Sequence, residues 1–117
     1  MAAPNIVNVT SINGKTAVQA VDTSATAIVS NAAGSGKVLK VNALYVGNVD
    51  SSVAYEMTVD VYRGTTAYRF APTISVAAKS SMDVFSKSIY LEEGDSIRIT
   101  ASAASKLEAV CSYEEIS

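Results

Sequence analysis

The sequence contains no histidine and no tryptophan, and it has one cysteine and two prolines among 117 residues. Without histidine, the chain can form neither a Ser-His or Cys-His nucleophile pair nor a histidine-ligated metal site. Cys111 has no partner for an intrachain disulfide, which excludes a small secreted module held together by disulfides. Cys111 lies on the apolar face of a predicted strand, so we expect it to be a small core residue. We therefore expect a protein that is not an enzyme.

Charged residues are also scarce. They make up 17 % of the chain, with nine Lys and Arg against eleven Asp and Glu. The cations are scattered and form no basic stripe, so nucleic acid is not an expected partner. No apolar run approaches the roughly 18 residues of a membrane-spanning helix, and the first residues lack the charged and apolar regions of a signal peptide. We expect a soluble protein made in a cytoplasm, with no membrane partner.

Small residues dominate what is present. Ala, Ser, Val and Thr account for 58 of the 117 residues, whereas the large core fillers are limited to two Phe and six Tyr among the aromatics. This length suits one domain, which we place at residues 1–117. An apolar chain with a thin core and few surface charges suggests that other subunits cover part of its surface. We therefore expect a homo-oligomer.

Apolar and polar residues alternate along most of the chain, as they do in half-buried β-strands. The pattern is clearest at residues 55–62, where every second residue from Tyr55 to Val61 is apolar. Similar segments cover residues 24–30, 37–46, 67–71, 82–85, 89–91, 97–101 and 107–113, with 75–78 as a short strand or a connection. Eight or nine short strands predict an all-β fold, a single antiparallel β-sandwich that is either jelly-roll-like or immunoglobulin-like.

Two local features add detail to this prediction, a turn signal and a proline. Asn13-Gly14 is the strongest hairpin signal, because a type I′ turn needs residues that accept positive φ. It predicts a turn between a strand through Val7 and Val9 and a second strand that follows Gly14. Pro72 cannot donate to a β-ladder, so the strand before it should stop there or lie at a sheet edge.

The segment from residue 100 to residue 115 is ambiguous. Its apolar residues fit a helix, and they also fit two strands around a turn at residues 102–106. We favour the two strands, because a helix would leave Ile97 and Ile99 without a hairpin partner and would bury Glu114.

Two motifs are similar to ligand-binding sites, but we interpret neither of them as one. Residues 34–37 (GSGK) lack the first Gly and the final Ser or Thr of a phosphate-binding loop, so we interpret them as a flexible hairpin loop. The carboxylates of residues 92–95, together with Glu114 and Glu115, are of the kind that Ca²⁺ prefers, but they lack a regular spacing. We favour a solvated acidic turn and expect no metal, no cofactor and no catalytic residue.

Several stretches together resemble a family of small virion structural proteins from tailed bacteriophages of marine bacteria and cyanobacteria. They are residues 4–10 (PNIVNVT), 59–64 (VDVYRG), 88–98 (SIYLEEGDSIR) and the tail 107–117. The resemblance implies a non-enzymatic virion component whose partners are the major capsid protein or neck and tail proteins. A capsid decoration or cement protein is the first expectation, and a neck, tail, baseplate or fibre-attachment component is the alternative. A carbohydrate-binding adsorption module is a further alternative. The implied location is the virion, after synthesis in the bacterial cytoplasm.

Five residues are the candidate contacts with other subunits. Residues 1–10 are expected to form an N-terminal arm or an edge strand, in which Ile6, Val7 and Val9 pair with the sheet of another subunit. The alternative is that this segment is an ordinary first strand of the chain's own sheet. Tyr62 points away from the core face of its strand, and Tyr113 lies close to the end of the sequence, so both are further interface candidates.

Overall fold

The fold is described from a computed structural model, in which residue 5 and residues 7–117 are well enough placed to describe. These residues contain nine strands and no helix, so none of their segments has the long apolar helix needed to cross a membrane. The strands are β1 (Ile12–Ala20), β2 (Thr26–Ser30), β3 (Val38–Asn48), β4 (Tyr55–Arg63), β5 (Thr66–Val76), β6 (Ser81–Asp83), β7 (Ile89–Leu91), β8 (Asp95–Ala101) and β9 (Leu107–Ile116).

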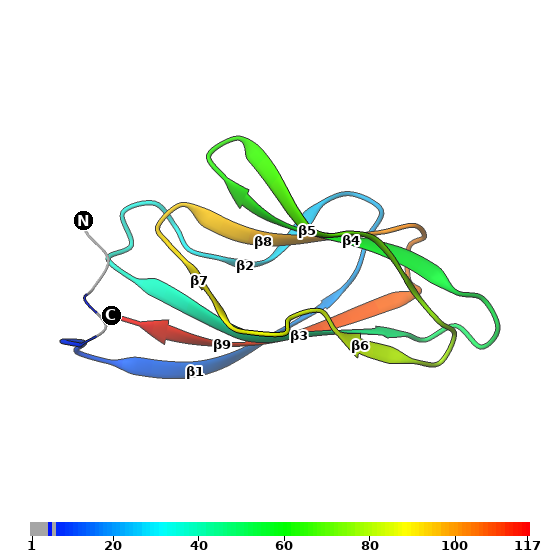
Figure 1. Ribbon diagram of the computed structural model, residues 1–117, viewed down its shortest axis with the longest axis horizontal. Coiled ribbons are helices and arrows are strands. Elements are labelled where there is room, and N and C mark those ends of the chain that lie inside the picture. The colour runs from blue at the N-terminus through cyan, green and yellow to red at the C-terminus, as the bar shows by residue number, and fades with distance from the viewer. Residues whose placement is uncertain (1–4, 6) are drawn as a thin grey trace.

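The strands form two antiparallel sheets that pack face to face (Figure 1). The first sheet has the order β1-β9-β3-β6, with β7 also paired to β3, and the second has the order β2-β8-β4-β5. β7 pairs with residues 39–41 of β3 and β6 with residues 45–47, so the two short strands together occupy one position beside β3. The predicted all-β antiparallel sandwich is confirmed.

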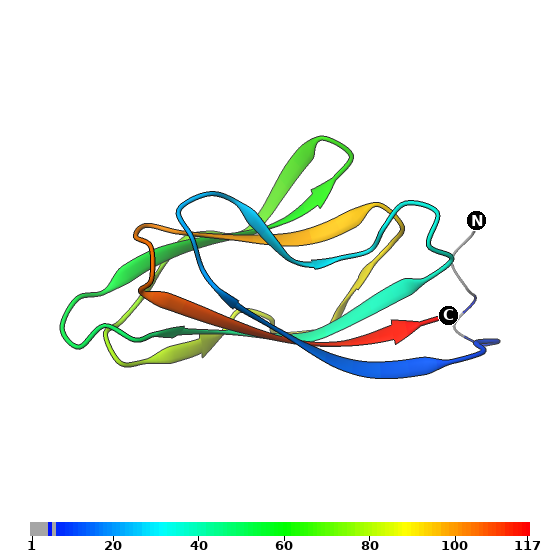
Figure 2. The same ribbon diagram turned by 180° about the vertical axis from the view of Figure 1, so that it is seen from behind.

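The strand order distinguishes between the two predicted kinds of sandwich. Most connections carry the chain from one sheet to the other, and the β4–β5 hairpin is the one turn between long neighbouring strands (Figure 2). With β6 and β7 counted as one interrupted strand, the result is two four-stranded sheets in the jelly-roll order. This order follows from pairings between strands far apart in the sequence, such as β1 with β9 and β2 with β8.

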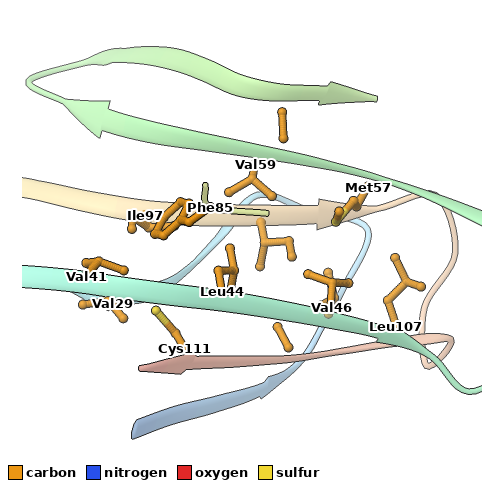
Figure 3. Close-up of a cluster of buried hydrophobic side chains, with 14 of the residues drawn as sticks. Val29, Val41, Leu44, Val46, Met57, Val59, Phe85, Ile97, Leu107 and Cys111 are labelled. Atoms are coloured by element: carbon orange, nitrogen blue, oxygen red, sulfur yellow. The ribbon is translucent and has the colours of Figure 1, made fainter. Parts of the chain in front are cut away.

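The core lies between the sheets and is built from the alternating residues that the sequence pattern identifies (Figure 3). Met57 and Val59 on β4 and Ile97 and Ile99 on β8 are at most 1 % exposed. They face the buried side chains of β3 and β9, among them Leu44. Each fully buried aliphatic side chain of this kind contributes about 1.5–3 kcal/mol relative to an exposed one. Because most residues of the core cluster are Val, Ala or Cys, the stability of the fold depends on many small apolar contacts.

The predicted hairpin at Asn13-Gly14 is wrong. Both residues lie inside β1, where Asn13 pairs with Glu115 and Gly14 with Glu114. Gly14 is not among the glycines with positive φ, which a type I′ turn would require. Val7 and Val9 are also outside any strand. A nine-residue ladder with β9 forms in place of a local hairpin, and it provides backbone hydrogen-bond partners along the whole of β1.

Two other local predictions are confirmed with changes. Residues 100–115 form the ends of two strands, but β8 and β9 belong to different sheets and do not pair with each other, so residues 102–106 cross between the sheets. β5 is an edge strand, yet it continues through Pro72 to Val76. It does so by shifting register against β4 and placing Thr73 at a φ of 49°.

Candidate interaction surfaces

The structure describes two of the three predicted N-terminal contact residues, Val7 and Val9. Ile6 is outside the described residues. Val7 is 88 % exposed and Val9 is half-buried. The backbone N–H groups of Thr10 and Ser11 donate to the carbonyl of Ser117 at 2.7 and 3.0 Å, which holds the start of β1 against the last residue of the chain. Of the two described residues in this group, the exposed Val7 is the one that the fold leaves open to a partner.

Tyr62 faces outward on β4, as predicted, but it is half-buried. The guanidinium carbon of Arg98 lies 4.0 Å from the centre of its ring, an attractive cation–π contact. Arg98 also donates to both carboxylate oxygens of Asp60, at 3.0 and 3.2 Å, and this bonding raises the pKa of Arg98. Tyr62 is therefore covered by a side chain of its own sheet, which leaves less of its ring available to a partner.

Tyr113 lies on the inner side of the first sheet. It is half-buried and packs against the hydrophobic core, two residues beyond Cys111 on β9. Cys111 is fully buried, which confirms it as a core residue, and burial raises the pKa of its thiol to about 11. Neither side chain is on an outer face of the sandwich.

The predicted solvated acidic turn is exposed at Glu92, but its last residue, Asp95, is buried and held by an ion pair, contrary to the prediction. Asp95 is 2 % exposed. Arg63 donates to it from Nε at 2.7 Å and from Nη2 at 2.6 Å, and the N–H of Glu92 donates at 2.9 Å. The hydrogen bonds from Arg63 hold the pKa of Asp95 below its ordinary value, although burial acts in the opposite direction. Arg63 also reaches the carboxylate of Glu92 at 2.9 Å.

The other carboxylates considered for a metal have protein partners as well. Glu93 accepts the N–H of Gly36 at 3.2 Å, and Glu114 accepts from the amide of Asn42 at 3.1 Å. Glu115 lies between Lys37 at 2.9 Å and Lys15 at 3.3 Å, and these cations lower its pKa. Within the described part of the chain, no three His, Cys, Asp or Glu side chains are grouped so as to hold a metal ion.

The loop at residues 34–37 connects the two sheets and is not a hairpin. Asn31, 3 % exposed, donates from its amide to the carbonyl of Lys37 at 2.9 Å and to that of Leu91 at 3.1 Å. Its amide oxygen accepts from the hydroxyl of Ser35 at 2.6 Å. The loop is thereby tied to the end of β7, and the polar groups of Asn31 and Ser35 are used within the fold.

A surface that the sequence did not reveal is an aromatic groove, which we define by Tyr68, Phe70, Phe85 and Tyr90. Tyr68 and Phe70 come from β5, in the β4–β5 hairpin that diverges from the rest of the sandwich in Figure 1, whereas Tyr90 is on β7 and Phe85 lies between β6 and β7. One part is a pocket of about 360 Å³, lined by Val61, Arg63, Tyr68 and Tyr90. An adjoining pocket of about 400 Å³ contains Phe70 and Phe85, whose ring centres are 5.1 Å apart. Tyr68 and Phe70 alternate on one strand, but Tyr90 belongs to the other sheet and Phe85 to the segment between β6 and β7, so the spacing of residues in the sequence does not predict this cluster.

The outer face of the first sheet carries a second exposed apolar feature. Val18, Val110 and Tyr45 lie side by side across β1, β9 and β3, and they are 74 %, 38 % and 49 % exposed. We call these three residues the apolar row. The neighbouring row is Thr16, Ser112 and Ala43, which are all small. A sheet face of this kind is shallow and apolar at its centre, which suits contact with another protein surface.

No family model matches this chain, and no curated protein matches it. A solved structure does match: a Bacillus endospore appendage, described as belonging to a novel family of disulfide-linked pili. The two chains are 18 % identical, with a TM-score of 0.54, over 90 % of this chain and 85 % of the appendage chain. At this level of identity the likeness concerns the fold alone. This chain and the appendage protein are therefore similar in their β-sandwich architecture.

Proposed function

We propose that this chain is a non-enzymatic structural protein of a bacteriophage virion, and most specifically a decoration or cement protein that binds the outer capsid lattice. Two considerations support the proposal. One is the resemblance of residues 4–10, 59–64, 88–98 and 107–117 to small phage virion proteins. The other is a surface suited to lying flat on another protein.

The observation that carries the proposal is the apolar row. Val18, Val110 and Tyr45 expose apolar area on a single sheet face, beside a row of small residues that do not obstruct a partner. The interaction of a lattice protein with a flat sheet face buries such side chains and releases the water around them. The three residues of the row are uncharged, and the charge nearest in register is Asp83 on β6, the cross-strand partner of Tyr45, so docking over Val18 and Val110 requires no desolvation of a charge within the row itself.

The likeness to an endospore appendage supports a role in a repeating assembly, because that protein has a similar fold and is described as forming pili. The mode of linkage must differ. Those pili are described as disulfide-linked, whereas Cys111 is the only cysteine here and is fully buried. Assemblies of this chain in its folded state therefore form through non-covalent contacts.

The proposal is tested by counting copies in purified virions with quantitative mass spectrometry. A decoration protein should approach the copy number of the major capsid protein. A ring or adaptor at the portal axis, which is the neck, tail or fibre-attachment alternative, would instead be present at about a dozen copies or fewer. That low number would contradict decoration and support the alternative.

A binding experiment tests the surface itself. Purified protein is added to capsids that lack it, and bound protein is measured after sedimentation. Val18→Lys should reduce binding strongly, because it places a charge in the apolar row. Val49→Lys is the matched control, since Val49 is 54 % exposed in a loop outside that row. Equal binding of the two variants would contradict the assignment of this face.

A second candidate function is carbohydrate binding during adsorption, and one observation favours it. The pocket beside Arg63 has two exposed tyrosines, Tyr68 at 59 % and Tyr90 at 45 %. Aromatic rings with a nearby hydrogen-bond donor can hold the apolar face and the hydroxyl groups of a sugar. On a glycan array, Tyr68→Ala should lose binding that the control Tyr45→Ala retains. The absence of any glycan binding by the unmodified chain would exclude this function.

A further inference from the structure

The jelly roll has four free sheet edges, and they differ in how well they could accept another strand. A free edge presents unpaired N–H and C=O groups, so proteins commonly interrupt it. β6 and β7 have three residues each. β2 has five residues and a register irregularity, and β5 contains Pro72 followed by Thr73 with positive φ. These three edges are therefore short or broken.

β1 is different. Its nine residues pair with β9 in one unbroken register, and its other side pairs with no strand of the described chain. Near the end of β1, the side chain of Gln19 donates to the carbonyl of Ala27 on β2 at 3.1 Å. β1 contains no proline and one charged residue, Lys15, whose Nζ lies 3.3 Å from Glu115 of the neighbouring strand. Ile12 and Val18 are 54 % and 74 % exposed. An edge that is long, regular and nearly uncharged is a template for strand addition.

We propose that β1 pairs with the β1 of a second copy of this chain, antiparallel, around a two-fold axis at Thr16. Thr16 is the central residue of the strand, so this register uses all nine residues of both copies. It places the two Thr16 side chains opposite each other and Val18 opposite Gly14 of the second copy. The contact is isologous, because the same residues serve on both sides.

The side chains of β1 are complementary to themselves in this register. Gly14 has no side chain, and the space where its Cβ would stand is open, so the large exposed side chain of Val18 from the second copy can lie over it. Glycine weakens a strand interior and often marks a close approach by another chain. Opposed threonines are a favourable cross-strand pair. Lys15 lies opposite Ala17, and each Lys15 remains beside its own Glu115.

Pairing of this kind joins the first sheets of two copies into one continuous sheet. The two outer faces then form one surface that carries two copies of the apolar row, one on each side of the axis. The paired chain would therefore present about twice the docking area of a single one. This inference concerns the isolated chain, so it can fail or succeed independently of the proposed role on a capsid.

The test is sedimentation equilibrium of the purified chain over a concentration series. The unmodified chain should show a monomer–dimer equilibrium. Thr16→Lys should raise the dimer dissociation constant by about tenfold or more, because two like charges would face each other across the axis. Thr16→Glu should have the same effect for the same reason. An equimolar mixture of the two variants should recover the dimer, since opposite charges then meet.

Thr26→Lys is the matched control, because Thr26 is an exposed threonine on the β2 edge. It should dimerise as the unmodified chain does. Thermal unfolding of each variant verifies that it is folded, as expected for substitutions at exposed positions. Three results would overturn the proposal: an unmodified chain that is monomeric throughout, a Thr16→Lys variant with unchanged affinity, or equal weakening by Thr26→Lys. Oligomers larger than a dimer that persist in Thr16→Lys would also overturn it.

Discussion

Arg63 holds the buried carboxylate of Asp95 with two hydrogen bonds, from Nε to Oδ1 at 2.7 Å and from Nη2 to Oδ2 at 2.6 Å. The two residues are cross-strand partners at the end of β4 and the start of β8. The pair therefore secures the register of two central strands of the second sheet at the end of the sandwich where the β4–β5 hairpin begins.

Replacing Asp95 should destabilise the fold. Asp95→Asn removes the charge-assisted hydrogen bonds and leaves a buried amide that cannot accept both donors of Arg63, at a cost of about 2 kcal/mol. The measurement is the free energy of unfolding from urea denaturation at neutral pH. Glu92→Gln is the control, because the exposed Glu92 contacts the same Arg63 and should matter little. Equal effects of the two substitutions would show that burial of Asp95 is unimportant.

Stability should decrease in acid. Asp95 and Glu115 both have a pKa below the ordinary values of 3.8 and 4.5 in the folded protein, because Arg63 and Lys37 respectively donate to them. A lowered folded pKa means that the stabilisation is present above the ordinary value and is lost as pH falls through the folded one. The free energy of unfolding should therefore be level near neutral pH and decline below about pH 4.5.

A variant identifies the source of this acid sensitivity. Urea denaturation of Asp95→Asn at the same series of pH values should give a shallower decline, because one of the titrating carboxylates is gone. A slope identical to that of the unmodified chain would assign the acid sensitivity to other groups.

Cys111 should be unreactive in the folded protein. Its thiol is fully buried and burial raises its pKa to about 11, so the reactive thiolate is scarce and inaccessible. Labelling with a coloured disulfide reagent at pH 8 should be slow in buffer and rapid in denaturant. Labelling in buffer as fast as in denaturant would place this thiol at the surface and contradict the described core.

Leu44 should be among the most sensitive core positions. It is 0 % exposed on β3 and packs between the two sheets (Figure 3). Leu44→Ala should lower the free energy of unfolding by about 3 kcal/mol, because it removes apolar burial and leaves a cavity. Val49→Ala is the control, since Val49 is exposed in the loop after β3 and should change stability by less than about 0.5 kcal/mol.

Much of the fold could be predicted because strand patterning is local. Alternation along residues 55–62 and 107–113 correctly identifies Met57, Val59 and Cys111 as core residues. Pro72 correctly predicts a sheet edge, because the missing N–H has the same consequence wherever the strand lies. The helix alternative for residues 100–115 is correctly rejected, although the expected hairpin does not form, because Ile97 and Ile99 pair with β2 and β4 instead of β9.

The candidate surfaces could be predicted only in part. Tyr62 does face outward, but Arg98 covers its ring from a strand 36 positions away. The aromatic groove joins Tyr68 to Tyr90 across two sheets, and no periodicity relates them. The apolar row joins three strands by register alone. Such contacts depend on which strands become neighbours, and the alternation within a single strand does not predict its neighbours.

Alternation in the sequence was enough to predict the class of structure and the inner face of most strands, because the backbone of a β-strand points successive side chains to opposite faces. It also excluded histidine chemistry and intrachain disulfides, since these need residues that are absent. The tertiary structure decided the jelly-roll order, the burial of Asp95 against Arg63 and the inclusion of Asn13-Gly14 in β1. Strand pairing satisfies backbone hydrogen bonds between segments far apart in the sequence, so a turn predicted from two adjacent residues can be replaced by a ladder that runs through both of them, as at Asn13-Gly14.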